Sequence, residues 1–130
     1  MMVAKDIMTQ RVITVSGEAP VQELAKLLIE NSVSGVPVAD PSGKLLGVAS
    51  EADILAKKGA LVKDIMNPNI FTVREDTPVE DIAAVMTREK IKRVLVVGEK
   101  ELSGIVSRAD IVRAIALGDY VPLRTPVYDL

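Results

Sequence analysis

Two serine–aspartate pairs, Ser107 with Asp110 and Ser50 with Asp53, have side chains and a spacing suited to binding a polar ligand. In each pair the serine follows a glycine and two β-branched or small apolar residues, and an apolar run with helical spacing follows the aspartate. Residues at i and i+3 share one helix face, so both side chains would point the same way from a helix N-terminus. The N–H groups and dipole at that end favour an anion. The pattern therefore suits a small anionic ligand that carries a diol.

The same spacing also fits a capping box at the start of a helix. In that interpretation the serine is the N-cap residue, and the acid reaches back to the N–H group of the serine. Such caps are common, and a duplicated fold would also duplicate its caps. The sequence leaves both interpretations open.

Composition excludes several classes of protein. The 130 residues include no cysteine and no histidine, so disulfides, zinc sites and the usual nucleophile–base pairs are unavailable. We therefore expect no enzyme, no catalytic residue and no metal site. A hydrophobic fraction of 48% with few aromatic residues predicts a globular chain with an aliphatic core. A net charge of −2 without a basic run argues against a nucleic-acid partner.

The location of the protein is also predicted from its apolar segments. No apolar run approaches the roughly 20 residues that a membrane span needs, and the N-terminus lacks the apolar region of a signal peptide. We therefore expect a cytoplasmic protein that has no membrane partner.

The chain contains an internal repeat. The tetrapeptide Lys-Asp-Ile-Met at 5–8 returns at 63–66, and the octapeptide that starts at Gly47 returns in modified form at Gly104. We predict repeats at 1–59 and 60–118, with Gly118 ending the last helix. The remaining residues, 119–130, contain two prolines and are predicted to form an extended tail.

Each repeat predicts the same order of elements. Strands are expected at 12–15, 36–39 and 45–49 in the first repeat and at 70–73, 93–97 and 102–106 in the second. A helix with apolar residues at i, i+3, i+4 and i+7 begins at each of Pro20 and Pro78, and a second helix follows each serine. Thr77 and Glu80 predict a capping box around Pro78. The predicted fold class is α/β, with two β-α-β-β-α repeats packed sheet to sheet about a pseudo-twofold axis and a cleft on each side.

Several of these motifs, repeated in tandem, resemble a pair of cystathionine-β-synthase (CBS) domains, the Bateman module. They are Asp-Ile-Met, Thr-Val, Pro-Val, Val-Ser-Gly-Val-Pro-Val and Gly-Val-Ala-Ser-x-x-Asp-Ile, and the resemblance covers residues 3–116. It implies a stand-alone ligand-sensing regulatory module that binds an adenosine-containing ligand, such as AMP, ADP, ATP or S-adenosylmethionine, between the repeats. AMP is the regulatory ligand that we expect first, with no catalytic cofactor. An attached or partner enzyme or transporter would be the regulated protein.

The resemblance also implies which residues bind the ligand. Asp110 and Asp53 would hold ribose hydroxyls, since an ionised carboxylate can accept from both hydroxyls of a diol, and Ser107 and Ser50 would contact phosphate. The implied set for the main cleft is Met8, Val12, Ile13, Val33, Ser34, Lys92, Arg93, Ser107, Arg108 and Asp110. The implied set for the second cleft is Ser50, Asp53, Met66, Ile70, Phe71 and Ile91. Each apolar member is equally well explained as part of the core.

The two implied clefts differ in charge. The residue after the serine is Arg108 in the second repeat and Glu51 in the first, and Lys92 and Arg93 have no basic counterpart in the first repeat. An arginine can bind phosphate with two hydrogen bonds, whereas a glutamate repels it. The main cleft therefore suits a phosphate, and the second cleft suits a nucleoside or a ligand with an uncharged tail.

An alternative function is a structural or oligomerisation module that binds no nucleotide, in which both Ser-x-x-Asp motifs are only helix caps. Under either function we expect a homodimer, because the helices and outer sheet faces carry more apolar surface than 130 residues can bury.

Overall fold

The structure is a computed structural model that describes residues 2–10, 12–99 and 101–116. The chain divides into two compact units. Unit 1 comprises Met1–Arg11 and Phe71–Leu130, and unit 2 comprises Val12–Ile70. The opening segment of each sequence repeat thus belongs to the compact unit that contains the rest of the other repeat.

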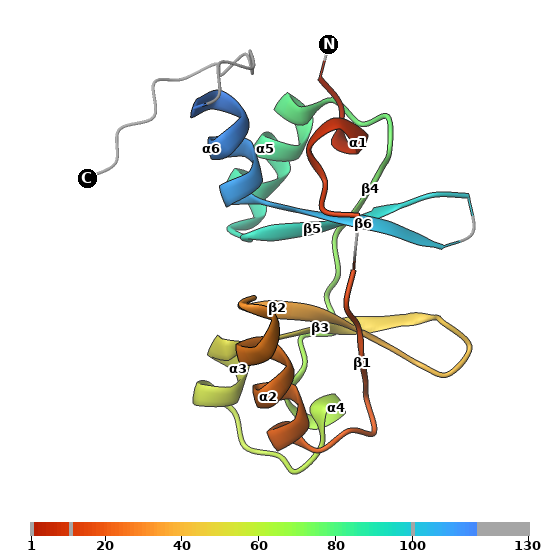
Figure 1. Ribbon diagram of the computed structural model, residues 1–130, viewed down its shortest axis with the longest axis vertical. Helices are drawn as coiled ribbons and strands as arrows, with labels where there is room; N and C mark the ends of the chain where they lie inside the picture. Colours follow the sequence, from red (N-terminus) through yellow and green to blue (C-terminus); the bar gives the residue numbers. More distant parts are fainter. Residues whose placement is uncertain (1, 11, 100, 117–130) are drawn as a thin grey trace. The chain divides into compact units, whose positions relative to one another are not determined.

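Unit 2 is a three-stranded sheet with helices packed on it (Figure 1). Its elements are β1 (Val15–Ser16), α2 (Val21–Asn31), β2 (Gly35–Ala39), β3 (Leu45–Ser50), α3 (Glu51–Ala56) and α4 (Val62–Ile65). Strand β2 lies in the middle of the sheet, parallel to β1 and antiparallel to β3. Helices α2 and α3 lie on the same side of this sheet.

Unit 1 repeats this arrangement with the second set of elements. They are α1 (Ala4–Ile7), β4 (Thr72–Arg74), α5 (Val79–Glu89), β5 (Arg93–Val97), β6 (Leu102–Ser107) and α6 (Arg108–Ala116). Strand β5 is parallel to β4 and antiparallel to β6. The predicted α/β fold with two β-α-β-β-α repeats is confirmed.

The cores follow from the apolar periodicities of the sequence. In α2 the residues at i and i+4, Leu24 and Leu28, are buried against β2 residues Val36 and Val38. In α5 the corresponding residues Ile82 and Met86 are buried in the core of unit 1. The side chains are almost all aliphatic, as the composition predicts.

The starts of the long helices differ from the prediction by one residue. Pro78 is extended, with φ −59° and ψ 140°, and is the N-cap residue, so α5 begins at Val79, and α2 likewise begins after Pro20. The capping box predicted for Thr77 and Glu80 is wrong. The hydroxyl of Thr77 instead accepts the Arg74 N–H at 3.0 Å, because Thr77 lies outside the helix and closes the turn after β4.

The first strand of each repeat is shorter and later than predicted. Residues 12–15 contribute only the start of Val15–Ser16, and residues 70–73 contribute only part of Thr72–Arg74. Parallel pairing with β2 and β5 covers two and three residue pairs, so only those residues enter a ladder. The predicted end of the last helix at Gly118 and the predicted extended tail at 119–130 lie outside the described residues.

The repeated Lys-Asp-Ile-Met segments form the short helices α1 and α4, which the sequence did not reveal. The carboxylate of Asp6 accepts the Val3 N–H at 2.8 Å, and that of Asp64 accepts the Leu61 N–H at 3.0 Å. Each aspartate therefore fixes the start of a single helical turn.

Across the part of the chain that the structure describes, none of the helices has the length and apolar character needed to cross a membrane.

Candidate functional site

The turn from β6 into α6 positions the main Ser-x-x-Asp motif. Ser107 ends the strand, and its backbone N–H donates to Oδ2 of Asp110 at 2.8 Å. The N–H of Asp110 donates back to the Ser107 hydroxyl oxygen at 3.2 Å. These reciprocal bonds form a capping box, so the helix-cap interpretation describes the geometry of this turn.

The second carboxylate oxygen of Asp110 has a cationic partner. Nη1 of Arg113 donates to Oδ1 of Asp110 at 3.1 Å. Asp110 is 8% exposed, whereas the Arg113 side chain is 65% exposed. The motif thus presents a nearly buried carboxylate whose two oxygens each have one protein partner. An ionised carboxylate offers about four acceptor positions, so it can still accept hydroxyl groups.

Unit 2 has the same motif in nearly the same geometry. Oδ2 of Asp53 accepts the Ser50 N–H at 2.9 Å and the Ser50 hydroxyl at 3.0 Å. Nζ of Lys57 lies 3.1 Å from Oδ1 of Asp53 and also donates to the Ile65 carbonyl at 3.2 Å. The cation therefore ties the motif to the end of α4.

The glycine that opens each octapeptide permits a close backbone contact. A Cβ atom at Gly104 would lie 2.7 Å from Sδ of Met8 and 2.8 Å from the Thr9 carbonyl oxygen. Beside it, Thr9 and Ile105 exchange two backbone hydrogen bonds, of 2.8 and 3.1 Å. The two repeated motifs of the sequence thus meet here, and Met8 lies in the same unit as Asp110.

The same contact joins the corresponding segments of unit 2. A Cβ atom at Gly47 would lie 2.5 Å from the Asn67 carbonyl oxygen and 3.1 Å from Sδ of Met66. Val48 and Asn67 exchange the two backbone bonds, of 2.9 and 2.8 Å. Met66 therefore lies in the same unit as Asp53.

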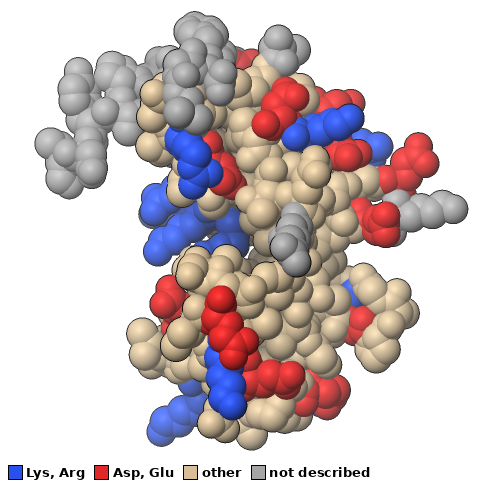
Figure 2. Space-filling view, viewed as in Figure 1, with Lys and Arg blue, Asp and Glu red and all other residues tan. Residues whose placement is uncertain are grey.

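The start of α6 adjoins a group of basic side chains. The Arg108 N–H donates to the Lys92 carbonyl at 3.0 Å, which brings these two residues together. Figure 2 shows Lys and Arg side chains gathered on unit 1 near the end of α5 and the start of α6. The exposed basic residues of these segments, called the basic group below, are Arg88, Lys90, Lys92 and Arg108. The N–H groups of Arg108 and Asp110 already have acceptors, so the basic side chains are the charged groups that an anion would meet here.

The corresponding positions of unit 2 carry no positive charge. The Glu51 N–H donates to the Ser34 carbonyl at 2.9 Å, in the same relation as Arg108 and Lys92. The residues that align with the basic group are Glu30, Ser32, Ser34 and Glu51. The charge difference predicted between the two motifs therefore extends to their surroundings.

The residues predicted for the two clefts are divided between the units. For the main cleft, unit 1 holds Met8, Lys92, Arg93, Ser107, Arg108 and Asp110, and unit 2 holds Val12, Ile13, Val33 and Ser34. For the second cleft, unit 2 holds Ser50, Asp53, Met66 and Ile70, and unit 1 holds Phe71 and Ile91. Within unit 1, Phe71 and Ile91 pack against the core, as Ile13 does in unit 2. The assignment of these sets to ligand binding stays a prediction.

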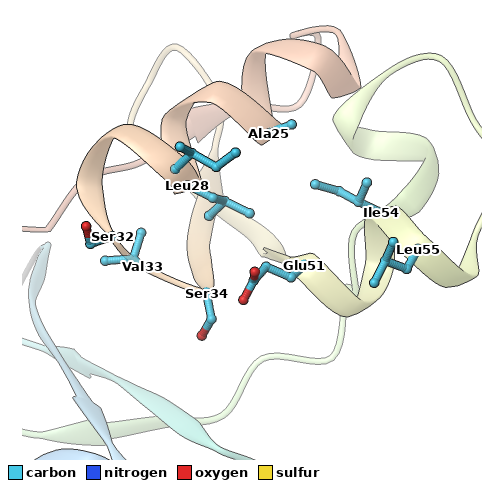
Figure 3. A pocket seen from close by; sticks show the side chains of 9 residues that line it. Ala25, Leu28, Ser32, Val33, Ser34, Glu51, Ile54 and Leu55 are labelled. Atoms are coloured by element: carbon cyan, nitrogen blue, oxygen red, sulfur yellow. The ribbon is translucent and has the colours of Figure 1, made fainter.

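Val33 and Ser34 line an open groove in unit 2 that has a volume of about 560 Å³. Figure 3 shows Ala25 from α2 and Ile54 from α3 on opposite sides of this groove, with Glu51 and Ser34 at one end. The complete lining is Ala25, Leu28, Ile29, Ser32, Val33, Ser34, Glu51, Ile54 and Leu55. We call it the α2–α3 groove.

Sequence reasoning missed Arg113 and Lys57, the cations that pair with the two aspartates. Their spacings of i+3 and i+4 place them on the same helix side as the acids, and that spacing was the available signal. Among the described residues, no group of three or more Cys, Asp or Glu could hold a metal ion.

The fold and the doubled motif define a tandem α/β repeat protein with one Ser-x-x-Asp turn in each unit. The CBS domain family matches residues 4–59 and 62–117, and the chain belongs to this family. It is 35% identical over 113 residues to L-aspartate semialdehyde sulfurtransferase of Methanocaldococcus jannaschii, covering 84% of this chain and 22% of that protein. It is 37% identical over 111 residues to inosine-5'-monophosphate dehydrogenase of Korarchaeum cryptofilum, covering 83% of this chain and 23% of that protein. The chain therefore spans less than a quarter of the length of these two relatives.

Solved CBS-pair structures have the same fold. CBSX2, a CBS-pair protein of Arabidopsis thaliana, in complex with AMP has a TM-score of 0.84 and 32% identity over 92% of this chain and 100% of that chain. The CBS domain pair of protein MJ0100 in complex with 5'-methylthioadenosine and S-adenosyl-L-methionine has a TM-score of 0.85 and 33% identity, over 91% of this chain and 98% of that chain. The CBS domain of a bacterial CNNM/CorC family Mg²⁺ transporter in complex with ATP has a TM-score of 0.80 and 26% identity, over 88% of this chain and 87% of that chain.

Proposed function

We propose that the chain is a regulatory module that binds an adenine nucleotide, AMP first among them, at the Ser107–Asp110 turn of unit 1. The observation that carries the proposal is the nearly buried Asp110 carboxylate in the first turn of α6, where Arg108 begins the helix and bonds to the backbone of Lys92. The AMP, S-adenosylmethionine and ATP complexes of similar CBS pairs support the ligand class.

The chemistry of each group matches one part of a nucleotide. The Asp110 carboxylate has acceptor capacity left for the ribose hydroxyls, and each such charge-assisted bond contributes about 1.5–3 kcal/mol. Arg108 and Lys92 lie together at the start of α6 and would bind the phosphate. The Arg113–Asp110 pair keeps the carboxylate in one orientation, because Arg113 binds Oδ1, the oxygen that the capping box does not use.

The Ser50–Asp53 turn of unit 2 would accept a different ligand. Its carboxylate has the same cap and a lysine partner, but Glu51 stands where Arg108 supplies a positive charge. A phosphate would meet a like charge there. We propose that this turn binds a nucleoside or a ligand with an uncharged tail.

The complete capping boxes favour a second candidate function. Both motifs form reciprocal serine–aspartate hydrogen bonds at their helix starts without any ligand, as a structural or oligomerisation module would require. In that case the repeat would only hold subunits together.

Thermal unfolding with nucleotides separates the two functions. A ligand that binds only the folded protein stabilises it by about 2.7 kcal/mol at a hundredfold excess over its Kd. At roughly 2–6 °C per kcal/mol, AMP should raise the unfolding midpoint by at least about 5 °C. The protein must first be checked for nucleotide retained through purification, by its absorbance near 260 nm. A nucleotide-free protein whose midpoint ignores millimolar AMP, ADP, ATP and S-adenosylmethionine would favour the structural module.

We also propose that the module acts as a homodimer and that it regulates an attached or partner enzyme or transporter rather than catalysing a reaction. The chain matches only 22% and 23% of the lengths of the two enzyme relatives, which supports a role as one part of a larger system. The dimer is supported by apolar side chains that the described part of each unit leaves exposed.

A further inference from the structure

The methionine of each Lys-Asp-Ile-Met segment packs its sulfur against the glycine that opens an octapeptide. Sδ of Met8 lies 2.7 Å from the point where a Cβ atom of Gly104 would stand, and the Thr9 carbonyl oxygen lies 2.8 Å from the same point. Sδ of Met66 lies 3.1 Å from the corresponding point at Gly47. The two sulfur atoms thus occupy space that a side chain would fill, and the contact is closer at Met8.

The thioether sulfur of Met8 is a group that a peroxide can oxidise. The 130 residues include five methionines and no cysteine, so no thiol competes for the oxidant. Met8 and Met2 are partly exposed and pack against the core of unit 1, whereas Met86 is 3% exposed within that core. A peroxide should therefore reach Met8 and Met2 more readily than Met86. Of the two, Met8 supplies the sulfur nearest to Gly104.

A change at Met8 is passed to the Ser107–Asp110 turn through β6. Thr9 and Ile105 exchange backbone hydrogen bonds of 2.8 and 3.1 Å, which fix the segment that contains Met8 to this strand. Ile105 lies two residues before Ser107, whose N–H and hydroxyl bond to Asp110. An atom added to Sδ of Met8 would therefore disturb the strand that ends in the proposed nucleotide-binding turn.

We propose that Met8 is a site of reversible oxidation by peroxides, and that its sulfoxide weakens nucleotide binding at the Ser107–Asp110 turn. The inference rests on the proposed nucleotide function and adds a covalent control of it. In the reaction the sulfur attacks one oxygen of the peroxide, so that an S–O bond forms and the O–O bond breaks. The sulfur loses two electrons to the peroxide, and the departing hydroxide takes the proton from the transferred oxygen and leaves as water.

The sulfoxide would not fit the place that the thioether occupies. Sδ of Met8 and the Thr9 carbonyl oxygen lie around one point beside Gly104, so an oxygen added on that side meets both backbone atoms and a like partial charge. An oxygen added on the other side still turns an apolar side chain of the core contact into a polar one. Either product therefore disturbs the contact with β6.

Peroxide treatment of the full chain tests the proposal. The protein is treated with hydrogen peroxide until mass spectrometry of its peptides shows one added oxygen atom at Met8, and the Kd for AMP is measured by calorimetry before and after. Oxidation should raise this Kd at least about fivefold, the lower limit expected when an extra atom enters a packed contact. Methionine sulfoxide reductases of both epimer specificities, supplied with a dithiol, should then restore the original Kd.

Met8→Leu and Met2→Leu are the matched pair of variants, because both replace a partly exposed methionine that packs against the core of unit 1. Each variant is compared with itself before and after peroxide, so the comparison does not depend on its basal affinity for AMP. Oxidation should leave the Kd of Met8→Leu unchanged, because that variant has no sulfur at position 8. Met2→Leu should keep the full response of the native protein.

The outcomes separate this inference from the nucleotide function. A native protein whose Kd for AMP stays constant after Met8 is oxidised would overturn the inference and leave the nucleotide function standing. The same conclusion would follow if Met8→Leu kept the full response, if peroxide modified Met8 no faster than the buried Met86, or if the Kd stayed high after Met8 had been reduced again. A native protein that binds no AMP before oxidation would contradict both proposals.

Discussion

Nη1 of Arg113 lies 3.1 Å from Oδ1 of Asp110, three residues earlier on α6, while Oδ2 of Asp110 accepts the N–H of Ser107. One nearly buried carboxylate thus joins the strand end to the second turn of the helix. A substitution at Asp110 therefore changes the helix start as well as any bound ligand, and the two effects must be measured separately.

The first prediction concerns the two aspartates. Asp110→Ala should weaken AMP binding about 10–100-fold, because it removes one or two charge-assisted bonds to ribose. Asp53→Ala should weaken it less, since Glu51 disfavours phosphate at the turn in unit 2. Titration calorimetry with AMP measures both constants.

Asp110→Asn is the control for folding, because an amide oxygen can still accept the Ser107 N–H and maintain the cap. It should recover much of the ligand-free unfolding midpoint without recovering the affinity. Equal losses at Asp110 and Asp53, or a larger loss at Asp53, would contradict the proposed difference between the turns.

The second prediction concerns the cap of α6. Ser107→Ala removes the hydroxyl oxygen that accepts the Asp110 N–H at 3.2 Å. The ligand-free protein should lose about 0.5–2 kcal/mol of stability, the usual range for an N-cap serine. Chemical denaturation measures this loss, and Ser107→Thr, which retains an acceptor, should recover most of it. A Ser107→Ala variant with an unchanged unfolding free energy would mean that this hydrogen bond contributes nothing to the stability of the helix.

The sequence predicted the elements that local patterns encode. The strand at 93–97 has the predicted bounds, and α2 and α5 follow the apolar spacing of residues such as Leu24 and Ile82. The helix that follows each serine is confirmed as well. These elements depend on residues within one or two turns of each other, so one sequence is sufficient to find them.

The elements that the sequence missed depend on distant partners. The helix at 4–7 is a single turn, and Thr9 finds its hydrogen-bond partner at Ile105 in the second repeat. No local pattern records such a pairing, so the division into compact units was not predictable. The pairing of Arg113 with Asp110 was predictable from spacing, but an exposed arginine has many other possible positions.

The third prediction tests the close approach at Gly104. Gly104→Ala would place a methyl group 2.7 Å from Sδ of Met8 and 2.8 Å from the Thr9 carbonyl oxygen. The segment that contains Met8 and Thr9 would have to move, at a cost of about 1–3 kcal/mol in unfolding free energy. Urea denaturation measures the cost.

Gly17→Ala is the matched control for Gly104→Ala, because its added methyl group would meet only ordinary contacts of 3.5 Å or more, the nearest with Lys63. It should change stability by less than about 1 kcal/mol in either direction. If the two variants were equally stable, the contact of Gly104 with Met8 and Thr9 would be loose enough to accommodate a methyl group.

The last prediction concerns the turn between β2 and β3. Hydrogen bonding lowers the pKa of Asp40 below its ordinary 3.8, chiefly through the Ser42 hydroxyl, with further bonds from the backbone N–H groups of Lys44 and Ser42. Oδ1 of Asp40 accepts the hydroxyl at 2.6 Å and each N–H at 2.9 Å. A lowered folded-state pKa means that this carboxylate stabilises the fold fully above its unfolded pKa, and that the stabilisation is lost as pH falls through the folded pKa. An NMR titration of the carboxyl carbons should therefore place the Asp40 midpoint below 3.8, and Ser42→Ala should move it upward because that variant removes the largest cause. The other carboxylates in the same spectra are the internal reference, and an Asp40 midpoint that Ser42→Ala leaves unchanged would contradict the assigned cause.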